Sequence, residues 1–473
     1  MSKRKRYLIG ALLLNLGGCM LGPDYQPPAS QLPENWRSAP LSAGENPANA
    51  IERNWWQHFN DPLLNQLIEK VGARNLDIKL AENRIVTARA ARAASSAVLL
   101  PSGDMMASAN RQQNQLGFPS SGPSNLAGLV KQPFNIFKSG FDASWELDLF
   151  GGHRRDVESA QAELEAAALS QADILVSSRA ETAKTYFDIR LYQAQWQLAQ
   201  QVLASDRQSL AIFQERYQQG DASADDAARA EAKLQHDQAQ IAYYANLQAQ
   251  AEYSLDLLLG AAPGTAHQLT AASAAVPVSP VQLVLAAPAA VIAQRPDIRY
   301  AERKLAAATA QQGAAVAKFF PDISLSGFVG LFNTNAGNFF SLSSKAFGMG
   351  ANMIWPILSF GTLSANLDAA DARQQEAMTQ YQHSILAALT DVERAFSAFS
   401  AQEQSRQALA KEAQANRQLL AIAEERYQQG QTAYPEVLDA QRICYASENN
   451  LSQATAQTGQ DLIAVYKRLG GGW

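Results

Sequence analysis

Apolar residues recur at helical spacing over two very long stretches of the chain, about 152–218 and about 362–428. A helix of about 65 residues would be roughly 100 Å long, so each stretch needs lateral neighbours, as in a coiled coil or a barrel of helices. The second stretch shows a heptad-like seam most clearly, in residues spaced 4, 3, 4 and 3 apart: Ile385, Leu389, Val392, Phe396 and Phe399.

Two shorter regions, about 101–149 and about 320–357, alternate apolar and polar residues with a period of two, which predicts one hairpin of strands in each. This is the pattern of transmembrane β-strands, and it is also the pattern of a soluble sheet that covers a core. The membrane interpretation is favoured by carboxylates on one face and by tryptophans near the strand ends. In the first region the apolar positions are Phe141, Ala143, Trp145 and Leu147, and they alternate with the polar Asp142, Ser144, Glu146 and Asp148. In the second region the apolar positions are Phe347, Met349, Ala351, Met353 and Trp355.

Two hairpins supply four strands, which are too few to close a transmembrane barrel, since about eight is the working minimum. Closure therefore requires oligomerisation. Three copies would supply about twelve strands, and the same threefold arrangement would let the long helices enclose a tube.

An internal repeat gives the chain a two-copy plan. The hexapeptide Glu-Arg-Tyr-Gln-Gln-Gly occurs at 215–220 and again at 425–430, and the same offset of 210 relates Trp145 to Trp355. We assign residues 61–260 to the first repeat and residues 296–473 to the second. Each repeat is expected to contain a helix (about 61–98 and about 297–318), a strand hairpin, the long helix, a turn at Gly220 or Gly430, and a second helix.

The N-terminus resembles a lipoprotein signal peptide over residues 1–18. Four basic residues precede a short apolar run, and Leu16-Gly17-Gly18 leads directly into Cys19, which is the pattern of a lipobox. We therefore expect a covalent lipid on Cys19 and no other cofactor. An ordinary signal peptide that contains a cysteine is the alternative.

Composition excludes several other classes of protein. The net charge is −5 with scattered basic residues, so nucleic-acid binding is not expected. Two cysteines and five dispersed histidines give no disulfide scaffold and no recognisable metal-ligand spacing. The sequence contains no G-x-S-x-G, H-E-x-x-H or Walker motif, so we do not expect an enzyme.

Several motifs resemble those of the TolC-like outer-membrane efflux proteins, in the lipoprotein branch called NodT-like. They occur in the family's order and span essentially the whole mature chain: Gly22-Pro-Asp-Tyr-Gln-Pro-Pro28, Trp55-Trp-Gln-His-Phe-Asn-Asp-Pro62, Gln294-Arg-Pro-Asp-Ile-Arg-Tyr-Ala-Glu302 and Val437-Leu-Asp-Ala-Gln-Arg442.

The resemblance implies an α+β membrane protein: a homotrimer whose twelve-stranded outer-membrane β-barrel, four strands from each protomer, continues into a long antiparallel α-helical barrel. Residues 19–60, as a lipid-anchored segment, and the linker 261–295 would contribute to an equatorial region. The implied partners are outer-membrane lipid, a periplasmic adaptor (membrane fusion) protein and an inner-membrane, proton-driven RND transporter. The implied function is passive conduction of small toxic compounds, with a type I protein secretion duct as the alternative.

The resemblance also places a periplasmic gate just after the second Tyr-x-x-Gly, at Glu436, Asp439 and Arg442, with Pro435 at a position where the family has an apolar residue. Threefold symmetry would turn each carboxylate into a ring of charge. Without the resemblance, these residues are simply solvated i, i+3 pairs. The hairpin tips at Tyr217, Gly220, Tyr427 and Gly430 are implied to contact the adaptor, although turn geometry alone also accounts for the two glycines.

Overall fold

The computed structural model describes residues 20–29, 32–38, 44–45, 52–113, 133–278 and 284–473. The chain forms two compact units. Unit 1 is made of the described residues that fall within 1–28, 85–166 and 302–380, and unit 2 of those that fall within 29–84, 167–301 and 381–473. The signal-peptide residues and Cys19 lie outside the described residues.

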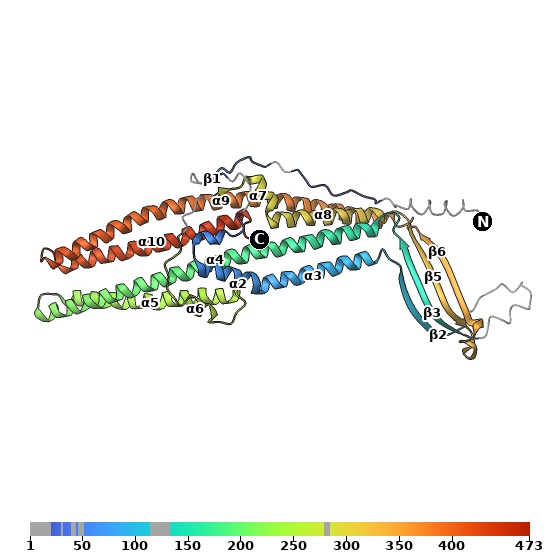
Figure 1. Ribbon diagram of the computed structural model, residues 1–473, viewed down its shortest axis with the longest axis horizontal. Coiled ribbons are helices and arrows are strands. Elements are labelled where there is room, and N and C mark those ends of the chain that lie inside the picture. Colours follow the sequence, from blue (N-terminus) through green and yellow to red (C-terminus); the bar gives the residue numbers. More distant parts are fainter. Residues whose placement is uncertain (1–19, 30–31, 39–43, 46–51, 114–132, 279–283) are drawn as a thin grey trace, which may run out of the picture. The chain divides into compact units, whose positions relative to one another are not determined.

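The helices and strands follow the two-copy plan (Figure 1). In chain order they are β1 (Gly44–Glu45), η1 (Trp55–Phe59), α2 (Pro62–Arg74), α3 (Leu76–Ala97), β2 (Ser102–Gln112), β3 (Phe134–Leu147), α4 (Gly152–Gln219), α5 (Ala224–Leu258), α6 (Thr265–Thr270), β4 (Val284–Leu285), α7 (Pro288–Gln294), α8 (Pro296–Ala317), β5 (Asp322–Asn333), η2 (Ala336–Asn338), η3 (Leu342–Ser344), β6 (Lys345–Ile354), α9 (Phe360–Gln428) and α10 (Tyr434–Leu469).

The predicted long helices and strand hairpins are confirmed. Helices α4 and α9 have 68 and 69 residues, and α5 and α10 have 35 and 36. The helix expected over about 61–98 is wrong in one respect, because it is broken at Asn75. The Asn75 side chain accepts hydrogen bonds from the backbone of Asp77 and Ile78 and donates one to the carbonyl oxygen of Leu258, so it ends one helix and caps the next.

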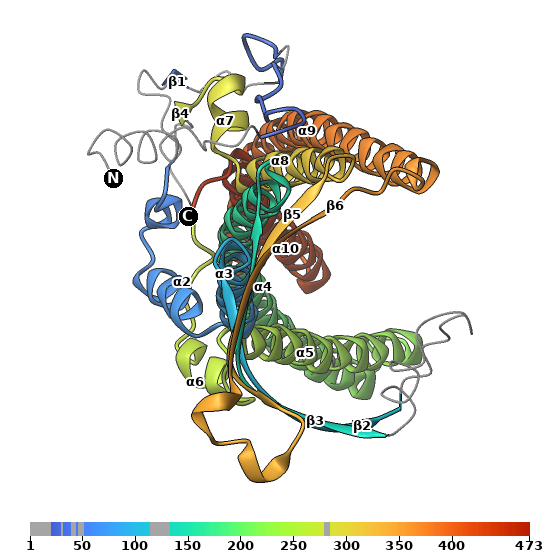
Figure 2. The same cartoon turned by 90° about the vertical axis from the view of Figure 1, so that its right-hand side faces the viewer.

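Unit 1 contains a four-stranded antiparallel sheet in the order β2-β3-β5-β6 (Figure 1), and Figure 2 shows the same strands after a turn of 90°. Register places four apolar side chains in one row across all four strands, and each is more than half exposed: Met105 (72%), Phe141 (61%), Val329 (61%) and Phe347 (87%). Because successive side chains alternate between faces, the neighbouring row on the opposite face contains Asp104, Asp142 and Phe328. The sheet therefore has an apolar face and a largely polar face, and the apolar face carries no core among the described residues.

The segment that follows Cys19 is packed against the helices of unit 1. The backbone N–H of Leu21 donates to the carbonyl oxygen of Phe150, and the fully buried guanidinium of Arg155 donates to the carbonyl oxygens of Leu21 and Gly22 and to the carboxylate of Asp24. Tyr25 continues the contact through its hydroxyl, which donates to Glu302. The Gly-Pro-Asp-Tyr motif is thus a docking segment for the start of α4 and for α8.

Unit 2 contains the main hydrophobic core. It is built around the aromatic side chains of η1, the apolar face of α2 and the facing sides of α4, α9 and α10, with members that include Trp55, Phe59, Leu67, Phe187 and Phe396. Trp55 stacks on Tyr466 at 5.6 Å between ring centroids. Packing therefore accounts for the three aromatic residues of the Trp-Trp-Gln-His-Phe motif, Trp55, Trp56 and Phe59, which are all buried.

No described helix is long and apolar enough to cross a membrane.

Candidate functional site

The two helical hairpins of unit 2 end in the same kind of turn. Gly220 and Gly430 have φ angles of +81° and +70°, which favour glycine because it lacks a Cβ. Each glycine N–H bonds back three residues, and the next N–H bonds back five, from Asp221 to Arg216 and from Gln431 to Arg426. These bonds form a Schellman motif, which satisfies the free carbonyl groups at the end of each long helix.

The aromatic rings at the tips lie at the surface. Tyr217 is 51% exposed and Tyr427 is 42% exposed, and the Tyr427 ring lies 5.2 Å from that of Tyr434. Half-exposed tyrosines combine an apolar ring with a hydroxyl that can stay in water, which is a common composition of contact surfaces. The tip geometry is compatible with a partner and is fully explained by turn formation.

The predicted gate residues lie in the first turns of α10. Pro435 is in the first turn, where its missing N–H costs no intrahelical hydrogen bond, and Glu436 is exposed. Arg442 and Asp439 form an ion pair of 3.5 Å in which the side chains are 67% and 74% exposed. The i, i+3 spacing therefore does bring these two residues together, in a weak surface pair.

The opposite side of α10 is buried, at Val437, Ala440, Cys444 and Ser447. Because those positions pack inward, Glu436, Asp439 and Arg442 are directed away from the packed seam. Burial raises the pKa of the Cys444 thiol, which fits a small packing residue and not a reactive thiolate.

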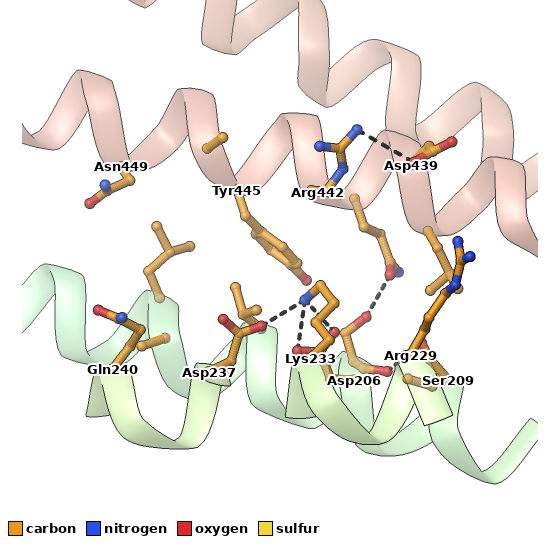
Figure 3. Close-up of a pocket in the computed structure, with 18 of the residues that line it drawn as sticks. Asp206, Ser209, Arg229, Lys233, Asp237, Gln240, Asp439, Arg442, Tyr445 and Asn449 are labelled. Atoms are coloured by element: carbon orange, nitrogen blue, oxygen red, sulfur yellow. Dashed lines mark hydrogen bonds and ion pairs between the residues drawn. The ribbon is translucent and has the colours of Figure 1, made fainter. Parts of the chain in front are cut away.

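Asp439 and Arg442 line one side of a cavity of about 500 Å³ (Figure 3). Helices α4 and α5 form the rest of it, with an apolar lining that includes Leu198, Val202 and Phe213. The hydroxyl of Ser205 on α4 donates to the side-chain oxygen of Gln441 on α10, which ties the two helices together beside the cavity.

The strongest polar feature of this cavity is a cluster that was not predicted from the sequence. The Lys233 amine on α5 donates to both carboxylate oxygens of Asp206 on α4, at 2.7 and 2.8 Å, and to Asp237 one turn along α5, at 2.6 Å. Asp206 is only 7% exposed, and Tyr445 points from α10 toward the same cluster (Figure 3). The i, i+4 spacing of Lys233 and Asp237 was visible in the sequence, but the partner Asp206 lies 27 residues away on another helix.

The cluster perturbs the titration of its members. Burial raises the pKa of the Asp206 carboxyl to about 6, and the neighbouring Asp237 carboxylate adds to the shift. Burial alone would lower the pKa of Lys233, but its hydrogen bonds to Asp206 and Asp237 outweigh that effect and hold the pKa above its ordinary value. The charge of the cluster therefore changes in the mildly acidic range.

Within the described residues, no group of three or more histidine, cysteine or acidic side chains is placed to hold a metal ion. The cavity combines surface charges, an amide tie and a buried ion cluster. These contacts connect α4, α5 and α10 around the cavity. A sheet that exposes one apolar face, together with two long helical hairpins, is typical of a subunit of a membrane channel.

Comparisons with known proteins identify the family of this chain. The family described as "Outer membrane efflux protein" matches residues 67–261 and 287–471. The solvent efflux pump outer membrane protein SrpC of Pseudomonas putida is 31% identical over 464 residues, covering 98% of this chain and 97% of the relative. Nodulation protein T of Rhizobium leguminosarum bv. trifolii is 30% identical over 478 residues, covering 99% and 97%. The solved structure of the outer-membrane channel OprN is 30% identical with a TM-score of 0.86, covering 96% of this chain and 100% of that one.

The chain therefore belongs to the outer membrane efflux protein family. It is an outer-membrane channel subunit of an efflux system, in a family of transport channels and not of enzymes. The resemblance to NodT-like efflux proteins is confirmed by the match to nodulation protein T.

Proposed function

We propose that three copies of this chain form the outer-membrane duct of a tripartite efflux pump, which conducts small toxic compounds outward. The observation that carries the proposal is the apolar row of Met105, Phe141, Val329 and Phe347, exposed across one face of the sheet. Such a row is costly in water and is stable against lipid. The opposite face carries carboxylates and serines suited to a wet lumen.

The two edges of this sheet support its closure by further copies of the chain. Strands β2 and β6 are each paired on one side only within the described sheet. In hydrocarbon, unpaired backbone groups cost several kcal/mol each. Pairing β6 of one copy with β2 of the next would satisfy both edges, and three copies would supply twelve strands of a closed wall.

A covalent lipid on Cys19 would anchor the same region to the membrane. The next residue, Met20, is described and lies against Gly151, where a Cβ would come within 2.9 Å of the Met20 Cα. Gly151 immediately precedes α4, close in sequence to the end of β3. Mass spectrometry of the mature N-terminus, with Cys19→Ser as the control, tests lipidation directly.

Energy and much of the substrate choice would come from partners. The partners we propose are a periplasmic adaptor protein at the hairpin tips and an inner-membrane RND transporter. The residues Glu436, Asp439 and Arg442 would act as the gate in the trimer. Solvent export, which the name of the Pseudomonas putida relative states for that protein, is one member of the proposed substrate class.

The deciding experiment is deletion of this protein in its native host, compared with deletion of the partner pump across a panel of toxic compounds. The two strains should become sensitive to the same compounds. Sensitivity in the pump deletion with unchanged growth in this deletion would contradict the proposal. A photocrosslinker at the exposed tip residue Gln219 would separate the alternatives, since capture of a type I secretion adaptor would favour protein export.

A further inference from the structure

Phe328 is one of the aromatic side chains on the polar face of the sheet, and its ring lies against the backbone of two glycines. Phe328 of β5 is directly opposite Asp142 of β3 in the register. A Cβ at Gly140 would lie 2.7 Å from the Phe328 ring, and a Cβ at Gly330 would lie 2.8 Å from it. Gly140 and Gly330 are themselves register partners, so the absence of side chains at both positions leaves the space that the Phe328 ring occupies.

The outward face of this ring holds a cation. The Lys138 amine lies 4.1 Å from the Phe328 ring centroid, and it donates to Asp142, four residues further along β3, at 3.5 Å. The Lys138 side chain is 29% exposed and that of Asp142 is 39% exposed, so water reaches both groups. The contact is a cation–π pair with an adjacent carboxylate, in which the Lys138 amine occupies the face of the Phe328 ring.

Charge on this face favours cations generally. Asp104, on β2, is the register partner of Asp142, and Glu146 lies further along β3 on the same face. Lys138 is the cation among these four charged side chains, which leaves the group with excess negative charge. A positively charged solute is therefore attracted to the part of this face where the partly buried Phe328 ring lies.

We infer that Phe328, with Asp142 beside it, forms a binding site for organic ammonium ions inside the channel. The Lys138 amine competes for this site, and such ions displace it. The inference rests on the proposed function, in which this face lines the lumen. The exchange is non-covalent: a substrate ammonium replaces the lysine amine on the ring, and Asp142 remains as the counter-charge. Because the occupant is only weakly held, solutes bind and then leave, as conduction requires.

The test is current block of the purified full-length trimer in planar bilayers, with tetrabutylammonium as the probe. Lys138→Met removes the competitor and should lower the half-blocking concentration roughly two- to fivefold, the range of an exposed cation–π contact. Phe328→Leu removes the ring and should raise it by a similar factor. Lys345→Met is the matched control, because Lys345 lies on the apolar face, in register with Leu331, and should leave block unchanged.

A second comparison separates the ring from simple charge. Lys138→Met also makes the lumen more negative, so it is repeated in the Phe328→Leu background, where its effect on block should shrink. Phe328→Tyr keeps the aromatic face, and should keep block within about twofold of the native channel. Equal effects of Lys138→Met in both backgrounds, or a Phe328→Leu channel that is blocked as readily as the native one, would overturn the inference. Absence of any conductance in the native trimer and also in the gate variants Glu436→Ala and Asp439→Ala would instead contradict the proposed duct.

Discussion

The indole nitrogen of Trp145, near the end of β3, donates a hydrogen bond of 3.0 Å to the carbonyl oxygen of Leu99, in the turn that precedes β2. The second repeat makes the same contact, from Trp355 to Phe319 over 3.1 Å. Each tryptophan thereby closes the base of one strand hairpin. The correspondence between the repeats thus extends to individual hydrogen bonds and not only to the order of the elements.

Replacing either tryptophan by phenylalanine should weaken its hairpin. Trp145→Phe and Trp355→Phe each keep an aromatic ring and lose one hydrogen bond, so each should lower the free energy of unfolding by about 1 kcal/mol. Heat-dependent loss of the folded trimer on semi-native gels measures the effect. The exposed Tyr253→Phe serves as the control. A Trp145→Phe trimer as heat-resistant as the native one would show that ring placement alone matters.

Arg155 should be the most sensitive residue of the docked N-terminal segment. It is 1% exposed and is the donor in three hydrogen bonds to Leu21, Gly22 and Asp24. Arg155→Met should release the segment and cost about 1–3 kcal/mol, since the carboxylate of Asp24 is largely exposed and water can replace its partner. Arg155→Lys should recover only part of this loss, because lysine lacks the planar fork.

Limited proteolysis of the segment after residue 20, together with trimer heat resistance, measures the release. The exposed pair of Arg229 and Asp225 offers a control, in which Arg229→Met should change stability by less than about 0.5 kcal/mol. Unchanged protease resistance in Arg155→Met would mean that the segment is held by packing of Tyr25 and the glycine contacts instead.

Local sequence was sufficient for the elements and insufficient for the contacts between them. Heptad spacing locates α9, and glycine at 220 and 430 locates the two reversals, because both signals act within a few residues. The break at Asn75 could not be predicted, because it depends on the carbonyl group of Leu258, 183 residues away. Asn75 in isolation is also an acceptable surface residue of a continuous helix.

The candidate functional site, like the fold, could be predicted from the sequence only in part. Asp439 and Arg442 could be paired from their spacing, and the structure contains that pair. The buried partner of Lys233 could not be identified, because the register between α4 and α5 decides whether Asp206 or a neighbouring residue meets the amine. A periodic pattern specifies which face of a helix is buried, but not how far one helix slides along the next.

The buried cluster predicts a pH dependence of stability. The pKa of Asp206 is raised to about 6 from an ordinary value of 3.8, so the folded protein binds this proton more tightly than the unfolded chain does. The resulting stabilisation is present in full below about pH 4 and is lost as the pH rises through about 6. Asp206→Asn should remove this component of the pH dependence.

Thermal unfolding followed by circular dichroism between about pH 4.5 and about pH 7.5 measures the component as the difference between native protein and Asp206→Asn. Gln240→Ala, a neutral change in the same cavity, should retain the native slope. If the native protein and Asp206→Asn show parallel pH profiles, the Asp206 carboxyl is not the titrating group.

Removing carboxylates from the start of α10 should make the pore more conductive. Glu436 and Asp439 are exposed on the side of α10 away from its packed seam, and in a trimer each would form a ring of three carboxylates. Glu436→Ala and Asp439→Ala should therefore raise single-channel conductance, and the double variant should raise it more than either alone. Arg442→Gln should change the single-channel conductance through Asp439, because it removes the ion-pair partner of that carboxylate.

The first repeat provides the comparison. Asp225→Ala removes one exposed carboxylate from the start of α5, the counterpart of α10, and should leave conductance unchanged if the effect is specific to the gate. Solvated i, i+3 pairs with no role in the pore would give native conductance in Glu436→Ala and Asp439→Ala as well. A rise in both α10 variants but not in Asp225→Ala would place the constriction on α10, because charges at the narrowest part of a pore have the largest effect on its current.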